Sequence, residues 1–212
     1  MRNLSLEEVK KYFEHKNYFI RGDFIDEYDF EDDYIDYYKN FIFSFNYNKK
    51  SFNYVSDIID LAAYFELFDE DLYIKYKGML SGSFHFVIKL SIINYIEHRF
   101  SVVSDFSLEA FFLQMLNRKN HVLVKNQILV SLFFLTKKEQ YFNLLLLSLN
   151  KTDDWRSIYR TLNHFVHYPI EKEPLRILLD NIRNKHSEKN FGKGVTDLLL
   201  QLEHTLMTRE VH

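Results

Sequence analysis

Apolar residues recur at helical spacing, in runs of two alternating lengths, through residues 107–166. Residues 107–116 and 141–149 each form a short run. Residues 121–135 and 155–166 each form a longer run whose apolar side chains share one helical face. Polar segments separate the runs, so the pattern predicts a short helix, a turn and a longer helix, twice. Repeated helix pairs favour an α-solenoid, because one pair cannot bury its apolar face without a neighbour.

The same rhythm predicts four helix pairs across residues 70–206. The pairs are residues 71–80 with 84–97, 108–116 with 122–135, 141–149 with 155–166, and 175–183 with 191–206. The last apolar residues of the first helices follow one another after 36, 33 and 33 residues: Leu80, Leu116, Leu149 and Ile182. An apolar residue is followed at once by a base in three of the second helices: Ile88 and Lys89, Val124 and Lys125, Trp155 and Arg156. In the fourth, Phe191 is followed by Gly192 and then Lys193.

An apolar residue followed by a base, early in the second helix of each pair, resembles the HEAT-like repeat family. The resemblance covers residues 70–206, although the intervals are shorter than in the most familiar members. The Asp that many members place before the apolar–basic pair is matched only by Asp153 and Asp154. The resemblance implies an all-α fold: a right-handed α-solenoid of HEAT-like helical hairpins, preceded by a helical, aromatic-rich N-terminal part.

Residues 1–69 lack the repeat and are predicted to form an acidic, aromatic-rich helical part of one continuous domain with the repeats. A helix is predicted over residues 4–19, with Gly22 ending this region. Only five Gly and two Pro occur in 212 residues, which argues for helices with short connections and against a β-sandwich.

Residues 41–55 fit two structures. Aromatic residues alternate on both sides of a polar segment, which suggests a β-hairpin. Apolar residues at helical spacing in residues 34–45 and 56–68 suggest helix, turn and helix instead. We favour the two helices and keep the hairpin as the alternative.

Residues 23–36 are the most strongly biased part of the chain. They contain no Lys or Arg and eight acids: Asp23, Asp26, Glu27, Asp29, Glu31, Asp32, Asp33 and Asp36. The segment fits a helix with an aromatic core face and a solvated acidic face. It also fits an acidic–aromatic surface that binds a basic partner. Residues 1–60 carry 8 bases and 13 acids, a balance of −5, whereas residues 61–212 carry 19 bases and 17 acids, a balance of +2.

The sequence offers little that supports catalysis or metal binding. It has no Cys, which excludes disulfides and thiolate ligands, and no Gly-rich phosphate loop, HExxH motif, calcium loop or nucleophile elbow. His164 and His167 are three residues apart on one predicted helix, but tetrahedral zinc would need two more ligands. We therefore predict a protein that is not an enzyme, with no cofactor and no metal site.

No apolar run reaches the roughly 18 residues that a membrane-spanning helix needs. Glu7 and Glu8 lie where a signal peptide would have its apolar run. We therefore expect a cytoplasmic protein with no membrane association, and the absence of Cys fits a reducing compartment.

A solenoid exposes a long curved surface, so binding is the expected class of function. The favoured hypothesis is a bacterial, non-catalytic protein that binds and inhibits a basic protein partner, such as a nuclease toxin domain. In size and acidity the chain resembles immunity proteins. Its richness in Phe, Tyr, Asn, Lys and Ile suits an AT-rich bacterial genome. The eight acids of residues 23–36 are the predicted partner-binding residues.

Two alternatives are a DNA-repair enzyme and a scaffold subunit with an aromatic N-terminal interface. Some HEAT-like proteins are alkylpurine DNA glycosylases, and this resemblance implies a groove with Asp153 or Asp154 as the acidic group. The groove residues are Lys89, Lys125, Trp155, Arg156 and Arg160. Nucleic acid is not the favoured partner, because DNA binding depends on phosphate neutralisation and the net charge is −3. For Trp155 we favour packing at the junction between repeats.

Overall fold

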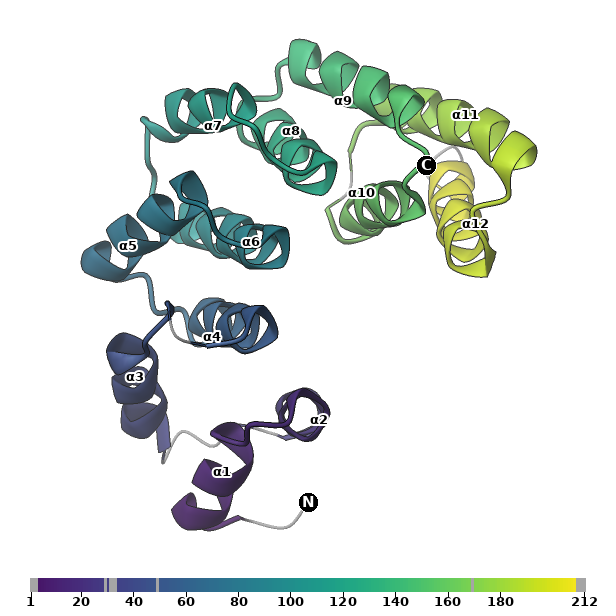
Figure 1. The fold of residues 1–212 in the computed structure, drawn as a ribbon. Helices are drawn as coiled ribbons and strands as arrows, with labels where there is room; N and C mark the ends of the chain where they lie inside the picture. The colour runs from purple at the N-terminus through teal and green to yellow at the C-terminus, as the bar shows by residue number, and fades with distance from the viewer. Residues whose placement is uncertain (1–3, 29, 31–33, 49, 169, 209–212) are drawn as a thin grey trace. The chain divides into compact units, whose positions relative to one another are not determined.

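The computed structural model describes residues 4–28, 30, 34–48, 50–168 and 170–208, which form twelve helices and no strand (Figure 1). The helices are α1 (Leu6–Phe13), α2 (Tyr18–Glu27), α3 (Ile35–Ser44), α4 (Phe52–Tyr64), α5 (Glu70–Ser81), α6 (Phe86–Val102), α7 (Leu108–Leu116), α8 (Val122–Thr136), α9 (Glu139–Lys151), α10 (Trp155–His167), α11 (Lys172–Lys189) and α12 (Lys193–Thr208). The all-α prediction is confirmed. Within the described ranges, no helix combines the length and the apolar character that crossing a bilayer requires.

The chain divides into two compact units, Met1–Ser104 and Asp105–His212. The first unit holds α1 to α6, and the second holds α7 to α12. The predicted boundary between the acidic part and the repeats, at residues 69 and 70, lies inside the first unit between α4 and α5. The first predicted repeat pair therefore belongs to the same unit as the acidic segment.

In the first unit, α4 is the central helix and contacts α2, α3 and α6. α1 contacts α2, and α5 contacts α6. Because α4 has several neighbours, apolar residues occupy most of its circumference, and its fully buried side chains are Val55, Ile58, Ile59 and Ala62. Asp57, Asp60 and Tyr64 form a stripe of less buried residues on the same helix. This stripe lies on the side of α4 that faces away from the core.

In the second unit, α8 contacts α7, α9 and α10, while α12 contacts α10 and α11. α8 has buried residues from Leu123 to Phe133 on all of its faces, as expected of a helix surrounded by others. Buried Asn126 of α8 donates to Ser157 of α10 at 2.5 Å and accepts from Ser148 of α9 at 2.5 Å. This amide satisfies its hydrogen bonds while joining three helices.

The predicted repeat helices agree with the structure except at their ends. α7 spans the predicted residues 108–116, whereas α11 continues through the predicted connection 184–190 as far as Lys189. No Gly or Pro interrupts the segment between Leu175 and Asn190, and polar residues alone do not end a helix. The helix stops where Asn190 adopts a left-handed φ of 46°.

The N-terminal part departs further from the prediction. Instead of one helix over residues 4–19, α1 ends at Phe13 and Asn17 caps α2, its side chain accepting from the Phe19 N–H at 3.0 Å. α2 continues through Gly22, so the prediction that this glycine ends the region is wrong. The described part of residues 41–55 contains the end of α3 and the start of α4. Helix, turn and helix is therefore confirmed there, and the hairpin is wrong.

A left-handed residue ends α4. Glu66 has a φ of 52°, and its N–H donates to the Ala63 carbonyl at 3.0 Å. The Leu67 N–H donates to the Ala62 carbonyl at 2.9 Å. These two bonds form a Schellman motif, in which the left-handed position is usually Gly. Glu66 therefore holds a conformation that Gly would adopt at lower cost.

Candidate functional site: an acidic–aromatic pocket between α2 and α4

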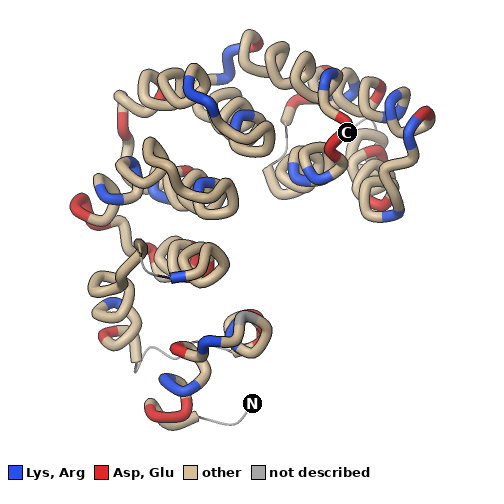
Figure 2. The backbone as a smooth tube through the Cα atoms, viewed as in Figure 1, with Lys and Arg blue, Asp and Glu red and all other residues tan. Residues whose placement is uncertain are grey.

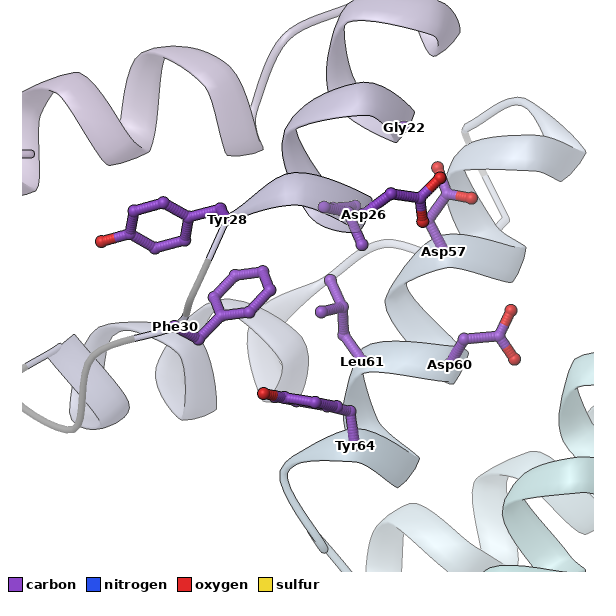
Figure 3. Close-up of a pocket in the computed structure, with 9 residues that line it drawn as sticks. Gly22, Asp26, Tyr28, Phe30, Asp57, Asp60, Leu61 and Tyr64 are labelled. Atoms are coloured by element: carbon purple, nitrogen blue, oxygen red, sulfur yellow. The ribbon is translucent and has the colours of Figure 1, made fainter. Parts of the chain in front are cut away.

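A pocket of about 520 Å³ lies between α2 and α4 in the first unit (Figure 3). Its lining residues are Gly22, Ile25, Asp26, Tyr28, Phe30, Asp57, Asp60, Leu61 and Tyr64. Figure 3 shows the three carboxylates on one side of Leu61 and the three aromatic rings on the other. The lining residues of α4 are at positions 57, 60, 61 and 64, the spacing of one helical face. Since α4 buries its other faces in the core, this face is held firmly at the pocket.

A buried arginine holds Asp57 in place. Arg21, only 1% exposed, donates to Asp57 Oδ2 from Nε at 2.9 Å and from Nη2 at 2.7 Å, and its Nη1 donates to the His15 carbonyl at 2.9 Å. Its guanidinium carbon lies 3.8 Å from the centroid of the Tyr54 ring. Burial raises the pKa of Asp57, and the hydrogen bonds and charge of Arg21 oppose that rise. Arg21 thereby joins α2 to α4 at the acidic side of the pocket.

The other two carboxylates are held differently. Ser91 of α6 donates to Asp60 Oδ2 at 2.9 Å, and its hydroxyl lies 2.6 Å from the hydroxyl of Ser56. Asp26 is exposed on α2 and makes no hydrogen bond or ion pair with any residue that the structure describes. After burial, the charge of Asp26 is a further cause of the raised pKa of Asp57. Asp26 and Asp57 are thus close enough to interact, and of these two carboxylates Arg21 is hydrogen-bonded to Asp57 alone.

Phe30 is the centre of the aromatic side. Its ring centroid lies 5.2 Å from that of Tyr28, 5.7 Å from that of Tyr64 and 5.3 Å from that of Phe65. These are the separations of packed aromatic pairs. Tyr64 is nevertheless 63% exposed, so much of its ring surface is available to a ligand. The aromatic side is a packed cluster with one open ring.

Four of the eight acids predicted to bind a partner lie among the described residues. Asp23, Asp26 and Glu27 are exposed on α2, and Asp36 is exposed in the first turn of α3. Of these four, Asp26 lines the pocket. The predicted site residues outside the described ranges are Asp29, Glu31, Asp32 and Asp33. The continuous helix considered for residues 23–36 is wrong, because α2 ends at Glu27 and α3 begins at Ile35.

The sequence-based prediction missed the contribution of α4 to the pocket. Asp57, Asp60 and Tyr64 lie outside the biased segment, on a helix that is otherwise mostly apolar. Their spacing places them on one face, and a polar stripe on an apolar helix marks a face turned away from the core. That stripe is the sequence signal that identifies them.

The residues of the alternative groove belong to both units. Lys89 is 8% exposed on α6 of the first unit. The others belong to α8 and α10 of the second unit: Lys125, Trp155, Arg156 and Arg160. Trp155 is 51% exposed, and its ring meets that of Tyr159, on the same helix, at a centroid distance of 6.3 Å. This aromatic contact is made within α10.

The two acids of the DNA-repair alternative are both paired with bases. Asp154 caps α10 and accepts from Arg156 Nε at 2.9 Å and Nη2 at 3.0 Å, which lowers the pKa of Asp154. Asp153 accepts from Lys189 Nζ at 2.5 Å and lies 3.5 Å from Lys185 Nζ. The Lys189 hydrogen bond is the main reason that the pKa of Asp153 is lowered. Both carboxylates act in ion pairs at the start of α10.

His164 and His167 do not form a metal site with any other residue of the described ranges. Burial first, and then the charges of His167 and Arg160, lower the pKa of His164 to about 4. Its ring stacks on Tyr168 at a centroid distance of 4.6 Å. In the described part of the chain, no three His, Cys, Asp or Glu residues come together as metal ligands would.

No protein-family model, characterised protein or solved structure matches the chain, so the function of the pocket must follow from its own residues. Carboxylates attract a cation by charge, and aromatic faces attract it through their quadrupole. In the second unit, acidic and basic residues are interspersed along the helices (Figure 2). The pocket of the first unit therefore has the chemistry of a site for a positively charged group.

Proposed function

We propose that the protein is a non-catalytic binding protein whose acidic first unit recognises a basic protein partner. The model for this activity is a bacterial, cytoplasmic immunity or antitoxin-type inhibitor that covers the cationic surface of a nuclease toxin. The observation that carries the proposal is the acidic–aromatic pocket between α2 and α4. An inhibitor of this kind needs no catalytic group, because it acts by occupying the surface that its partner uses.

We further propose a right-handed, HEAT-like solenoid as the architecture, and the helix contacts within each unit support the stacking of helical hairpins. In the first unit α2 contacts α4 and α4 contacts α6, and in the second unit α8 contacts α10 and α10 contacts α12. The odd-numbered helices α3, α5, α7 and α11 each contact the even-numbered helix that follows, whereas α9 makes its main contacts with α8 and α11. Helical hairpins that stack side by side give this order of contacts.

The exposed acids outside the pocket support a long-range role. Asp23 and Glu27 on α2, and Asp36 on α3, are exposed and contribute to the negative charge balance of residues 1–60. Surface charges of one sign accelerate the association of an oppositely charged partner. They do so over about 10 Å at 0.1 M salt and over about 3 Å at 1 M, so binding through them is salt-sensitive.

The proposal is tested by capturing the partner from cells that naturally contain the protein. The test variant is Asp23→Asn, Glu27→Gln and Asp36→Asn, which removes three exposed acids from the first unit. The matched control removes three exposed acids from the second unit by Glu171→Gln, Glu188→Gln and Asp197→Asn. Both variants change the net charge equally, so a difference between them reports where the charge lies.

We expect the wild-type protein and the second-unit control to retain the same basic protein, released by 1 M salt. The first-unit variant should retain much less of it. The inhibition itself is measured as loss of the partner's activity at a one-to-one ratio. Retention of a neutral or acidic partner, or equal retention by both variants, would refute the proposal.

The DNA-repair alternative has less support. A DNA-repair enzyme needs an available acidic group, whereas Asp153 and Asp154 are both held in ion pairs. The exposed Trp155 is the feature that keeps a nucleic-acid interface as a second candidate. Tight binding of double-stranded DNA that falls steeply with salt would favour it over the basic protein partner.

A further inference from the structure

We infer that the pocket between α2 and α4 receives one arginine side chain of the partner, with its guanidinium beside Asp26 and its stem across Leu61 and Tyr64. The inference rests on the proposed function and specifies the chemical group that this surface recognises. It differs from recognition by charge alone, because a single side chain has to enter a particular cavity.

The first unit already holds two of its own guanidinium groups by the same combination of carboxylate and tyrosine. Arg21 is bonded to Asp57 and lies 3.8 Å from the centroid of the Tyr54 ring. Arg99 donates from Nη2 to Glu70 at 2.6 Å and lies 3.9 Å from the centroid of Tyr73. A planar guanidinium can stack on a ring while its edge donates to a carboxylate, and this pairing suits arginine better than lysine.

The pocket also offers a carboxylate and a tyrosine, Asp26 and Tyr64, and no arginine of the described residues is paired with this carboxylate. Asp26 has no hydrogen bond or ion pair within the described residues, and it interacts electrostatically with Asp57. The single positive charge of Arg21 balances only one of the two negative charges of Asp26 and Asp57. A second guanidinium beside Asp26 would balance that charge and add charge-assisted hydrogen bonds, which are stronger than neutral ones.

The rest of the pocket suits the stem of the side chain. Leu61, which is 3% exposed, lies between the carboxylates and the rings in Figure 3 and forms the floor of the pocket, and Tyr64 presents a ring that is 63% exposed. The arginine stem is apolar and covers such surfaces while its head stays polar. The pocket volume of about 520 Å³ far exceeds the roughly 30 Å³ of one water molecule, so a whole side chain fits with some water around it.

The test uses a fluorescent eight-residue peptide of alternating Ser and Arg, whose dissociation constant is measured by polarisation at 0.1 M salt. Two matched peptides carry Lys or the uncharged citrulline in place of Arg. The protein variants are Asp26→Asn and Tyr64→Ala, with Asp71→Asn as the control. Asp71 is an exposed acid of the same unit that does not line the pocket, and its replacement changes the net charge equally.

We expect the arginine peptide to bind several-fold more tightly than the lysine peptide, and the citrulline peptide not to bind measurably. Asp26→Asn should weaken the arginine peptide about tenfold, since it removes a charge-assisted contact. Tyr64→Ala should weaken it about threefold through loss of the apolar contact with the arginine stem. Asp71→Asn should change it less than twofold. Circular dichroism melting of each variant shows whether it is folded.

Three results would overturn the inference. One is equal weakening by Asp26→Asn and Asp71→Asn, and another is equal affinity for arginine and lysine peptides. Both results leave the proposed function intact, because they are compatible with a basic partner bound by general charge attraction. The third is binding of spermidine as tight as that of the arginine peptide, which would make the pocket a small-cation site. Failure of the partner-capture experiment is a separate outcome and is the one that removes the proposed function.

Discussion

Replacing Arg21 with Met removes a buried cation while keeping most of the length of the side chain. In the native protein Arg21 is 1% exposed, and its guanidinium makes three hydrogen bonds, two to Asp57 and one to the His15 carbonyl. The variant leaves Asp57, whose side chain is 19% exposed, next to Asp26 with no cation between them. The first unit should therefore become less stable.

The expected loss follows from the burial of the pair. Removing one partner of a buried ion pair costs about 3–5 kcal/mol, mainly because the remaining charge stays desolvated. Asp57 retains some contact with solvent, so we expect Arg21→Met to lower the free energy of unfolding by about 3 kcal/mol, near the lower end of that range. At the usual urea dependence of about 1–3 kcal/mol per molar, the midpoint of unfolding should fall by about 1–3 M.

The pH dependence has a definite sign. Burial raises the folded-state pKa of Asp57, and loss of Arg21 removes the main influence that lowers it, so the pKa rises further in the variant. For a group with a raised folded pKa, the stabilisation is present below its unfolded pKa and is lost as the pH rises through its folded pKa. The defect of Arg21→Met should therefore be largest at pH 7 and shrink as the pH falls toward the usual range of Asp.

The assay is urea unfolding followed by circular dichroism at several pH values. Arg156→Met is the matched control, since Arg156 forms a comparable ion pair with Asp154 but its side chain is 52% exposed. An exposed pair contributes little, so this variant should unfold close to the wild-type midpoint. Arg21→Met with Asp57→Asn should recover part of the lost stability. A midpoint for Arg21→Met equal to that of Arg156→Met would refute the reasoning.

Three further predictions concern other parts of the fold. Val124→Asp and Leu162→Asp should each unfold the protein or nearly so, because both positions are fully buried and a buried charge costs several kcal/mol. Circular dichroism melting measures the stability of each variant, and a melting curve like that of the wild type would contradict the observed packing. Because the pKa of His164 is lowered to about 4, the stability it contributes is present above its unfolded pKa of about 6.5 and is lost as the pH falls toward 4. His164→Gln should flatten that loss in urea titrations, whereas the same change at exposed His204, which does not contribute to the pKa shift of His164, should not. Glu66→Gly should raise the free energy of unfolding by about 1 kcal/mol by relieving the left-handed φ of 52°, and an unchanged or lower melting temperature would contradict this.

The repeat helices could be predicted from the sequence because their apolar stripes are long and regular. α7 occupies the predicted residues 108–116, and α8 and α10 begin at the expected Val122 and Trp155. The end of α11 could not be found in this way, because the polar residues before Asn190 fit a helix as well as a loop. Without a Gly or Pro, only tertiary contacts and the left-handed φ of Asn190 decide where that helix ends.

The candidate site could be predicted only in part. The acidic bias of residues 23–36 led to Asp26, which lines the pocket. It could not separate Asp26 from Asp23 and Glu27, because composition does not show which exposed acid faces a cavity. Asp57 lies 31 residues after Asp26 in the chain, and its place beside Asp26 depends on the contact between α2 and α4. A contact of that kind comes from folding and has no local sequence signal.

The hydrogen bond from Ser91 to Asp60 has an evolutionary consequence. Ser91 belongs to α6 and does not line the pocket, yet it orients one of the carboxylates that do. A substitution at Ser91, or at its neighbour Ser56, would change ligand preference while every lining residue stayed the same. Divergent copies of this chain could thus acquire different partners through substitutions at Ser91 and Ser56, behind the residues that line the pocket. Their recognition residues would then look identical in an alignment.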